Sequence, residues 1–370
     1  MFWGTEVETG FHRASLHYQG LTLHTASSGA IAGLDALYLR LGPLGAPMAV
    51  AEVRLNCAYL NGYPAEVLIA AAQDLVARLD WGKTSADLRR DLMDSAAPAP
   101  VRALVDCALW DLEARQKGLP LAHLLAGRPV ALSRGSNQTL FLSSDDQMLA
   151  QAKTYVARGF ADLKLRFGAD FDADLARLQL LRDHFGPDLV LAIDANGSWP
   201  VELAADRLDR LAPLDLKYVE QPIAPGDWDA LVALAAGAPM PLMLDESMAG
   251  PSDVARAVEG FEAANGRLWA HLKLIKTGGI TPALAAVQAF EARGLPYMIG
   301  QMNEGGLATA AAAHLALATR PVAAELYGAD GLIDDPAQGL TYTAGQIVLP
   351  DAPGLGLPFD TRRAPHMMEN

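Results

Sequence analysis

Three acidic residues lie at the ends of three consecutive apolar segments of the chain. Asp194 ends LVLAID, Glu220 lies in LKYVEQ and Asp245 lies in PLMLDE. Each acid alone fits a turn or a helix cap. Three carboxylates that converge at a low-dielectric site repel one another unless a cation joins them. Because oxygen ligands suit Mg²⁺, with Mn²⁺ as the alternative, better than zinc, the three together predict a divalent metal site.

A lysine lies inside the next apolar segment, HLKLIKTGGI (271–280). A buried lysine is costly without a partner, so we expect Lys273 to point toward the acids. Desolvation and neighbouring cations would lower its pKa and make it a general base. The alternative is that Lys273 only pairs with a carboxylate. For Lys276 the sequence leaves open a role in the site or in the turn that follows.

Two further cations, Lys164 and Arg166, lie two positions apart in ADLKLRFGAD (161–170). Side chains two apart on a strand face the same side. We therefore expect both cations to lie across the site from Lys273.

The segments that carry these residues belong to a repeated pattern. From about residue 134, a short apolar strand alternates with a helix-compatible stretch of about twenty residues. Strands that are apolar on both faces and alternate with helices pair in parallel, and eight such units indicate an α/β barrel whose active site lies at the carboxyl ends of the strands. The predicted strands are 138–143, 162–167, 189–194, 216–221, 241–246, 270–275, 296–300 and 322–327.

The first 130 residues lack this pattern. Helical periodicity appears at 85–96 and 101–118, after a probable sheet, whereas the Gly- and Pro-rich 340–359 predicts irregular chain. We predict three parts, which are an α+β capping domain over 1–130, a barrel over 131–335, and a C-terminal segment, 336–370, that returns to the capping domain.

The overall composition excludes several classes of protein. The 370 residues carry a formal net charge of −14, which argues against nucleic-acid and anionic-membrane partners. The two cysteines, Cys57 and Cys107, are too few for a disulfide scaffold and wrongly spaced for a zinc motif. No signal peptide or apolar run of membrane-spanning length is visible, so we expect a soluble, cytoplasmic protein.

The pattern resembles the enolase superfamily, in its muconate-lactonising (muconate cycloisomerase and mandelate racemase-like) subgroup, with local similarity to dipeptide epimerases. The similar segments are 101–129, 271–280 and 299–316. The resemblance implies a modified (β/α)7β TIM barrel with an N-terminal α+β capping domain. It implies that Asp194, Glu220 and Asp245 bind Mg²⁺, that Lys273 removes the α-proton of a small carboxylate to form an enediolate, and that Glu304 is a catalytic-site glutamate. The absence of a histidine after YMIG disfavours the mandelate-racemase branch.

The chain departs from the family at Arg166. The family pattern is Lys-x-Lys, in which the first lysine, here Lys164, contacts the substrate carboxylate and the second is an acid/base catalyst. Arginine is effectively always protonated and is a poor base, although it binds carboxylates in bidentate fashion. We therefore expect one-base chemistry, either cycloisomerisation or β-elimination. The alternative is a racemase or epimerase of an amino-acid derivative or dipeptide.

Two readings from other classes remain open. One is a Schiff-base lyase or aldolase with Lys273 or Lys164 as nucleophile, and the other is a catalytically silent metal-binding barrel. We expect a small carboxylate substrate, specificity from the segment 12–24 and other capping loops, and a homo-oligomer by default. The expected substrate-binding residues are Gln301, Asn303, Asn196 and Tyr327.

Overall fold

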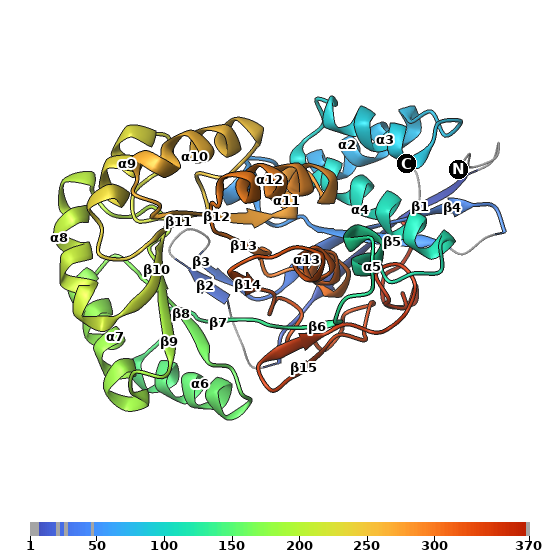
Figure 1. Ribbon diagram of the computed structural model, residues 1–370. Helices are drawn as coiled ribbons and strands as arrows, with labels where there is room; N and C mark the ends of the chain where they lie inside the picture. The colour runs from blue at the N-terminus through green and yellow to red at the C-terminus, as the bar shows by residue number, and fades with distance from the viewer. Residues whose placement is uncertain (1–6, 20–22, 26–28, 46–47, 368–370) are drawn as a thin grey trace.

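The computed structural model describes residues 7–19, 23–25, 29–45 and 48–367. Its largest element is a parallel sheet of eight strands paired in chain order (Figure 1). All eight predicted strands are confirmed, each within a few residues of its predicted bounds. They are β7 (Gln138–Leu140), β8 (Asp162–Arg166), β9 (Val190–Asp194), β10 (Leu216–Glu220), β11 (Leu242–Leu244), β12 (Leu268–Lys273), β13 (Tyr297–Gly300) and β14 (Ala323–Glu325).

Helical segments follow the first seven of these strands and surround the sheet, whereas β14 leads into the C-terminal segment. The edge strands meet where the N–H of Asn137 donates to the carbonyl of Ala324 at 3.0 Å. The architecture is therefore the predicted (β/α)7β barrel. The helices are α6 (Asp145–Ala157), α7 (Phe171–Phe185), α8 (Val201–Leu211), the 3₁₀ turn η1 (Ala212–Leu214), α9 (Trp228–Gly237), α10 (Pro251–Ala263), α11 (Leu274–Thr277), α12 (Ile280–Arg293) and α13 (Gly306–Ala318).

Local sequence signals explain where the barrel helices begin. Ser144 and Gln147 form a reciprocal capping box at the start of α6. Asp170 and Asp227 accept the third backbone N–H of α7 and α9, respectively. These caps fix where the helices begin after β7, β8 and β10, whereas the carboxyl ends of the strands lie at one mouth because the strands are parallel.

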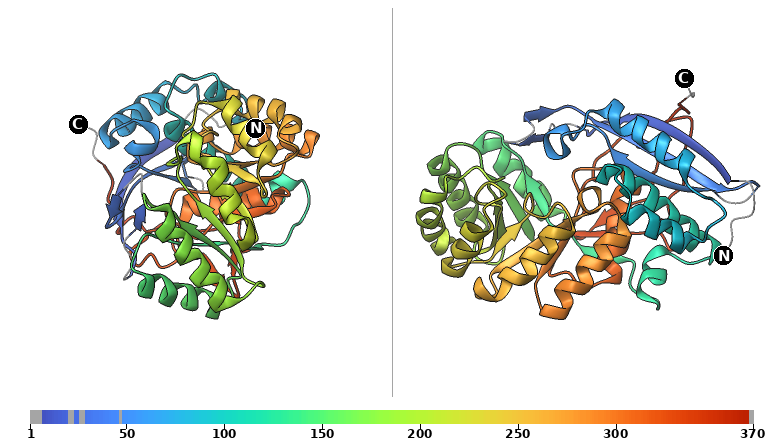
Figure 2. Two further views of the ribbon diagram at one scale, coloured as in Figure 1. Left: turned by 90° about the vertical axis from the view of Figure 1, so that its left-hand side faces the viewer. Right: turned by 90° about the horizontal axis from the view of Figure 1, so that it is seen from above.

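The N-terminal part is an antiparallel three-stranded sheet in the order β1–β4–β5, covered by helices. Figures 1 and 2 show it beside the barrel, on the side of α11 to α13 and away from α7 and α8. The elements are β1 (Val7–Leu16), β2 (Leu23–Thr25), β3 (Gly29–Ile31), β4 (Leu34–Pro43), β5 (Ala49–Arg54), α1 (Ala58–Asn61), α2 (Ala65–Arg78), α3 (Ser85–Met93), α4 (Ala99–Gln116) and α5 (Leu121–Ala126).

The C-terminal segment is more regular than its composition predicts. The strands β15 (Thr341–Thr343) and β16 (Gln346–Val348) form a hairpin, and β16 pairs with β6 (Ser133–Gly135). The prediction of irregular chain over 340–359 is wrong for these strands. Further on, the N–H of Met367 donates to the carbonyl of Phe11 at 2.8 Å, so the segment contacts β1.

Two side chains of β5 attach the capping sheet to the barrel. The carboxylate of Glu52 accepts the N–H groups of Gly305, Leu307 and Ala308 at 2.7, 3.1 and 3.3 Å, at the start of α13. Arg54 donates to the carbonyl of Met302 at 2.5 Å. The loop between β13 and α13 is therefore held by the capping domain.

Among the described helices, none is long and apolar enough to cross a membrane.

The buried His314 predicts a pH dependence of stability. Its Nδ1 accepts the N–H of Ala122 at 3.0 Å, and burial lowers its pKa from 6.5 to about 4. The unfolded chain therefore binds a proton more readily, so this contribution is fully present above pH 6.5 and is lost as the pH falls toward 4. At pH 5 we expect a loss of about 2 kcal/mol from this group. The measurement is urea unfolding of the wild type and His314→Asn at pH 7.5 and 5.

The matched control is His184→Asn, which replaces an exposed histidine of α7. It should retain the pH dependence of the wild type, whereas His314→Asn should lose about 2 kcal/mol of it. Equal pH dependence in all three proteins would contradict the assignment.

Candidate active site

Lys164 of β8 lies at the centre of a buried ion cluster in the barrel. Its Nζ donates to Oε2 of Glu220 at 2.8 Å and lies 3.6 Å from Oδ2 of Asp194. It also pairs with Glu325 at the end of β14. Burial opposes the charge on Lys164, but Glu220 and Glu325 raise its pKa well above the ordinary value. Lys164 is therefore a fixed positive charge shared between acids of separate strands.

Arg166 points from the same face of β8 into the mouth, as its spacing from Lys164 predicts. Its Nη1 pairs with Oδ2 of Asp194 and donates to Oδ1 of Asn196 at 3.1 Å. The other oxygen of Asp194 accepts the N–H of Asn196 at 2.8 Å. Both carboxylate oxygens of Asp194 thus have partners.

Lys273 ends β12 on the other side of the barrel and contacts Asp245. Its Nζ donates to Oδ2 of Asp245 at 2.8 Å, and Nζ of Lys276 lies 2.5 Å from Oδ1 of the same carboxylate. Burial disfavours the charge on Lys273, but Asp245 outweighs it and raises the pKa of the lysine. The prediction of a lowered pKa is wrong for this arrangement of charges, because the nearest group is a carboxylate.

His271 completes the cluster from the same strand face as Lys273. Its Nδ1 lies 3.0 Å from Oε1 of Glu220 and 4.0 Å from Oδ1 of Asp245. Burial, followed by the charge of Lys273, lowers the pKa of His271 below its ordinary value. Burial alone would raise the pKa of Glu220, but Lys164 and His271 hold that pKa well below its ordinary value.

These side chains fit a divalent cation. Glu220, Asp245 and His271 each offer a ligand atom, and the three atoms lie within 4.8 Å of one another. All three side chains are buried, and carboxylate oxygens are the ligands that Mg²⁺ prefers. Asp194 lies beside this group but is engaged by Arg166. Binding of a cation would relieve the repulsion between the carboxylates.

A cavity of about 520 Å³ opens above the cluster. Arg166 and Lys273 line it from the barrel, together with the expected substrate-binding residues Asn196, Gln301 and Asn303. The capping domain contributes both polar and apolar side chains to the same wall. The described lining residues from that domain include Leu60, Asn61, Tyr63, Ala99 and Pro100.

Two other predicted site residues, Glu304 and Tyr327, lie behind the lining of this cavity. The carboxylate of Glu304 accepts the N–H of Met302 at 3.1 Å, and its own N–H donates to Oε1 of Gln301 at 2.8 Å. The ring of Tyr327 is buried against Phe141, with 6.5 Å between ring centroids. Glu304 therefore positions residues of the cavity wall, and a contact of either side chain with substrate stays a prediction.

The capping segment 12–24 is described only in part. Tyr18 donates its hydroxyl hydrogen to the carbonyl of Gly328 at 2.5 Å, next to the end of β14. Residues 20–22 lie outside the described residues, so the predicted role of this segment in specificity stays a prediction.

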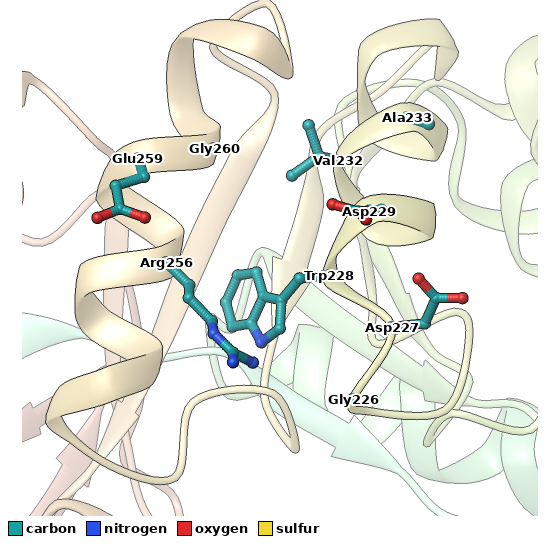
Figure 3. Close-up of a pocket in the computed structure, with 9 residues that line it drawn as sticks. All are labelled: Gly226, Asp227, Trp228, Asp229, Val232, Ala233, Arg256, Glu259 and Gly260. Carbon is teal, nitrogen blue, oxygen red and sulfur yellow. The ribbon is translucent and has the colours of Figure 1, made fainter.

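A second hollow, of about 870 Å³, lies on the outside of the barrel between α9 and α10 (Figure 3). Trp228 of α9 and Arg256 of α10 point toward each other there, whereas Glu259 projects from the far side of α10. The described lining residues come from the two helices and the turn before α9, away from the strand ends. This hollow therefore lies apart from the buried ion cluster of the barrel mouth.

The sequence did not single out His271 and Glu325 of the cluster, and it left the role of Lys276 open. His271 lies two positions before Lys273, and this spacing on one strand face was a usable signal. Glu325 ends the eighth predicted strand, as the three metal-site acids end theirs. Lys276 lies on α11, and its contact with Asp245 depends on the turn after β12.

Comparison with known proteins places this geometry in context. A family model described as enolase C-terminal domain-like matches residues 147–364. The chain is 34% identical over 262 residues to an L-Ala-D/L-Glu epimerase of Clostridium acetobutylicum, which covers 69% of this chain and 71% of the relative.

Solved structures share the fold over nearly the whole chain. A dipeptide epimerase from Methylococcus capsulatus, complexed with Mg and the dipeptide L-Arg-D-Lys, superposes with a TM-score of 0.85 at 28% identity and covers 96% of this chain and 99% of its own. A muconate lactonizing enzyme from Pseudomonas fluorescens has a TM-score of 0.87 at 24% identity, with 97% of each chain covered. The latter likeness shows the fold alone.

Gly300 leaves the space that the ring of His271 occupies, which predicts an energetic coupling between the two positions. A Cβ added to Gly300 would overlap Nε2 of His271. We expect Gly300→Ala to reduce stability by about 1–3 kcal/mol, as overpacking does. In the double variant Gly300→Ala/His271→Ala the loss should be smaller than the sum of the single losses. Urea unfolding of the three variants measures this coupling.

The control is Gly237→Ala at the end of α9, where an added Cβ meets nothing within 4 Å. That change should be neutral or stabilising. If the losses of stability in the two single variants add up to the loss in the double variant, the position of the His271 ring does not depend on Gly300.

Proposed function

The chain belongs to the enolase superfamily, and from this premise we propose that it removes and returns the proton next to a carboxylate, as a racemase or epimerase of a dipeptide or N-acylated amino acid. The observation that carries the proposal is the placement of Lys273 opposite Lys164 and Arg166 around one buried acidic cluster. This substrate class is supported by the names of the Clostridium acetobutylicum relative, an L-Ala-D/L-Glu epimerase, and of the Methylococcus capsulatus structure, a dipeptide epimerase.

The chain's own residues have distinct roles in this proposal. Lys273 lines the cavity and takes the α-proton on one face of the substrate. Lys164 places a fixed positive charge beside the carboxylate on which negative charge develops. Arg166 lines the cavity from the opposite strand, where the second face of the α-carbon would lie.

Glu220 and Asp245 would hold a divalent cation, with Asp194 or His271 beside them, and we propose Mg²⁺. When bound, this ion supplies Lewis-acid stabilisation of the substrate carboxylate. If Asp245 were a ligand of this ion, Lys273 would lose part of the interaction that keeps it protonated and would be able to accept a proton. The capping residues Asn61 and Tyr63 close the cavity over the substrate.

Arg166 also favours a second candidate, which is one-base β-elimination or cycloisomerisation. Racemisation requires a proton carrier on each face of the α-carbon. A guanidinium keeps its proton in proteins and is therefore poorly suited to that role. If Arg166 only binds a carboxylate, Lys273 alone can still support elimination or ring formation.

Proton exchange in D₂O tests the proposal. Purified protein with Mg²⁺ is incubated with a panel of dipeptides, N-acyl amino acids and hydroxy acids, and the products are followed by NMR and chiral chromatography. We expect deuterium at the α-carbon together with inversion, and a rate about 10²–10⁴-fold lower in Lys273→Met because the base is lost. Lys153→Met, an exposed lysine of α6, should keep the rate of the wild type.

Arg166→Lys separates the two candidates. In a racemase or epimerase this change supplies a titratable carrier for the second face, so the ratio of inversion to exchange should rise. Elimination or ring closure that depends on Lys273, without α-deuteration of recovered substrate, would establish the second candidate instead.

A further inference from the structure

The amide of Gln301, directly after β13, offers the substrate cavity a hydrogen-bond donor that no group of the described chain accepts. We propose that Gln301 is a specificity-determining residue whose NH₂ group binds an acyl oxygen on the amino nitrogen of the substrate, and that the cavity favours N-acylated amino acids without an ammonium group over dipeptides with a free N-terminus. This inference rests on the proposed function and selects one of the two substrate classes named there.

The side chain of Gln301 is buried and held in one orientation. Its Oε1 accepts the N–H of Glu304 at 2.8 Å, and a reversed amide would set the NH₂ group against that N–H. The amide also lies against Gly328, where an added Cβ would overlap it. Nε2 has no hydrogen-bond partner in the described part of the chain. Because a buried donor without a partner is costly, a substrate oxygen at Nε2 would be stabilising.

The carbonyl groups that follow β13 and β14 beside this amide are already used by donors of the capping domain. Arg54 donates to the carbonyls of Met302 and Asn303 at 2.5 and 3.4 Å. The hydroxyl of Tyr18 donates to the carbonyl of Gly328 at 2.5 Å. A substrate ammonium at this wall would therefore compete with a guanidinium for the same oxygens. An acyl oxygen meets no such competition.

The carboxylates of the barrel mouth are engaged or lie on another side of the cavity. Glu325, at the end of β14, pairs with Lys164 and is not among the described lining residues. The two carboxylates among those lining residues, Asp245 and Glu246, both follow β11. On the side of β13 an ammonium would therefore lack an anion, and a buried charge without a partner is strongly unfavourable.

The capping domain adds a second donor of the same kind. Oδ1 of Asn61 accepts the N–H of Tyr63 at 2.9 Å, which fixes the orientation of the Asn61 amide. Its Nδ2 is buried and has no hydrogen-bond partner among the described residues. Asn61 and Gln301 line the same cavity. The cavity thus presents unpartnered NH₂ groups from both barrel and cap, which favours a substrate rich in acceptor oxygens.

Matched pairs of ligands test this preference on the whole protein with Mg²⁺. L-Ala-L-Leu and N-propionyl-L-Leu differ only in that a hydrogen replaces the ammonium of the dipeptide, and further pairs carry Glu or Arg in place of Leu. Titration calorimetry measures the dissociation constants, and α-deuteration in D₂O measures kcat/KM. We expect the N-propionyl acid of the preferred pair to bind at least about tenfold more tightly than its dipeptide, with the same order in kcat/KM.

A charge-changing variant tests the role of the amide itself. Gln301→Glu replaces the NH₂ group by a carboxylate oxygen of nearly the same shape. It should shift the preference at least about tenfold toward the dipeptides, which a loss of structure would not do. Circular dichroism checks its folding. Gln288→Glu makes the same change at an exposed position of α12 and should leave the preference of the wild type unchanged.

Equal or tighter binding of the dipeptides to the wild type would overturn the proposal and point to Glu246, whose Oε2 has no described partner, as the acceptor of the ammonium. An unchanged preference in a folded Gln301→Glu variant would overturn it as well, as would the absence of binding by every N-propionyl acid. Binding is measured without turnover. A protein that prefers the N-propionyl acids but exchanges no α-proton would therefore contradict the proposed function and still support the role of Gln301.

Discussion

The balance of buried charge in the barrel mouth is the constraint on which the rest of the structure depends. Each charged side chain in the mouth would cost several kcal/mol to bury alone, and removal of one side chain leaves the charge of its partner uncompensated. Lys164 illustrates the arrangement, because it joins acids from β10 and β14 that are far apart in sequence. The ions that share this environment are Lys164, Arg166, Lys273, Lys276, Asp194, Glu220, Asp245 and Glu325.

Two features of the fold position these charges. The parallel strands end at the same mouth, and the capping domain holds the loop between β13 and α13. Glu52 caps α13, and Arg54 binds the carbonyl of Met302, so two side chains of β5 hold the segment that carries Gln301 and Asn303. The shape of the cavity is therefore set jointly by barrel and cap. Fixed donors and charges of this kind stabilise a developing carboxylate charge without reorganising during the reaction.

The fold alone does not decide the reaction, because one fold can carry many chemistries. The groups that distinguish this site in our proposal are Arg166, at the position where the family resemblance implies a lysine, and His271, whose imidazole contacts the acidic cluster. Arg166 engages Asp194 and His271 contacts Glu220, and Lys164 lies close to both of these carboxylates. The proposed proton transfer and the proposed binding of a cation would thus both depend on one set of carboxylates.

The apolar periodicity predicted the eight strands, and the strand-end positions of Asp194, Glu220 and Asp245 predicted their convergence, because strand and helix periodicities are local and parallel strands end at one mouth. The sequence did not reveal the hairpin of β15 and β16. The strand β16 pairs with β6, which lies more than half the length of the chain earlier in the sequence. The sequence also misjudged the pKa of Lys273, since that value depends on which charge lies nearest. The contacts of His271, Lys276 and Glu325 were decided only by tertiary structure, because distances between side chains of separate strands arise when the sheet closes.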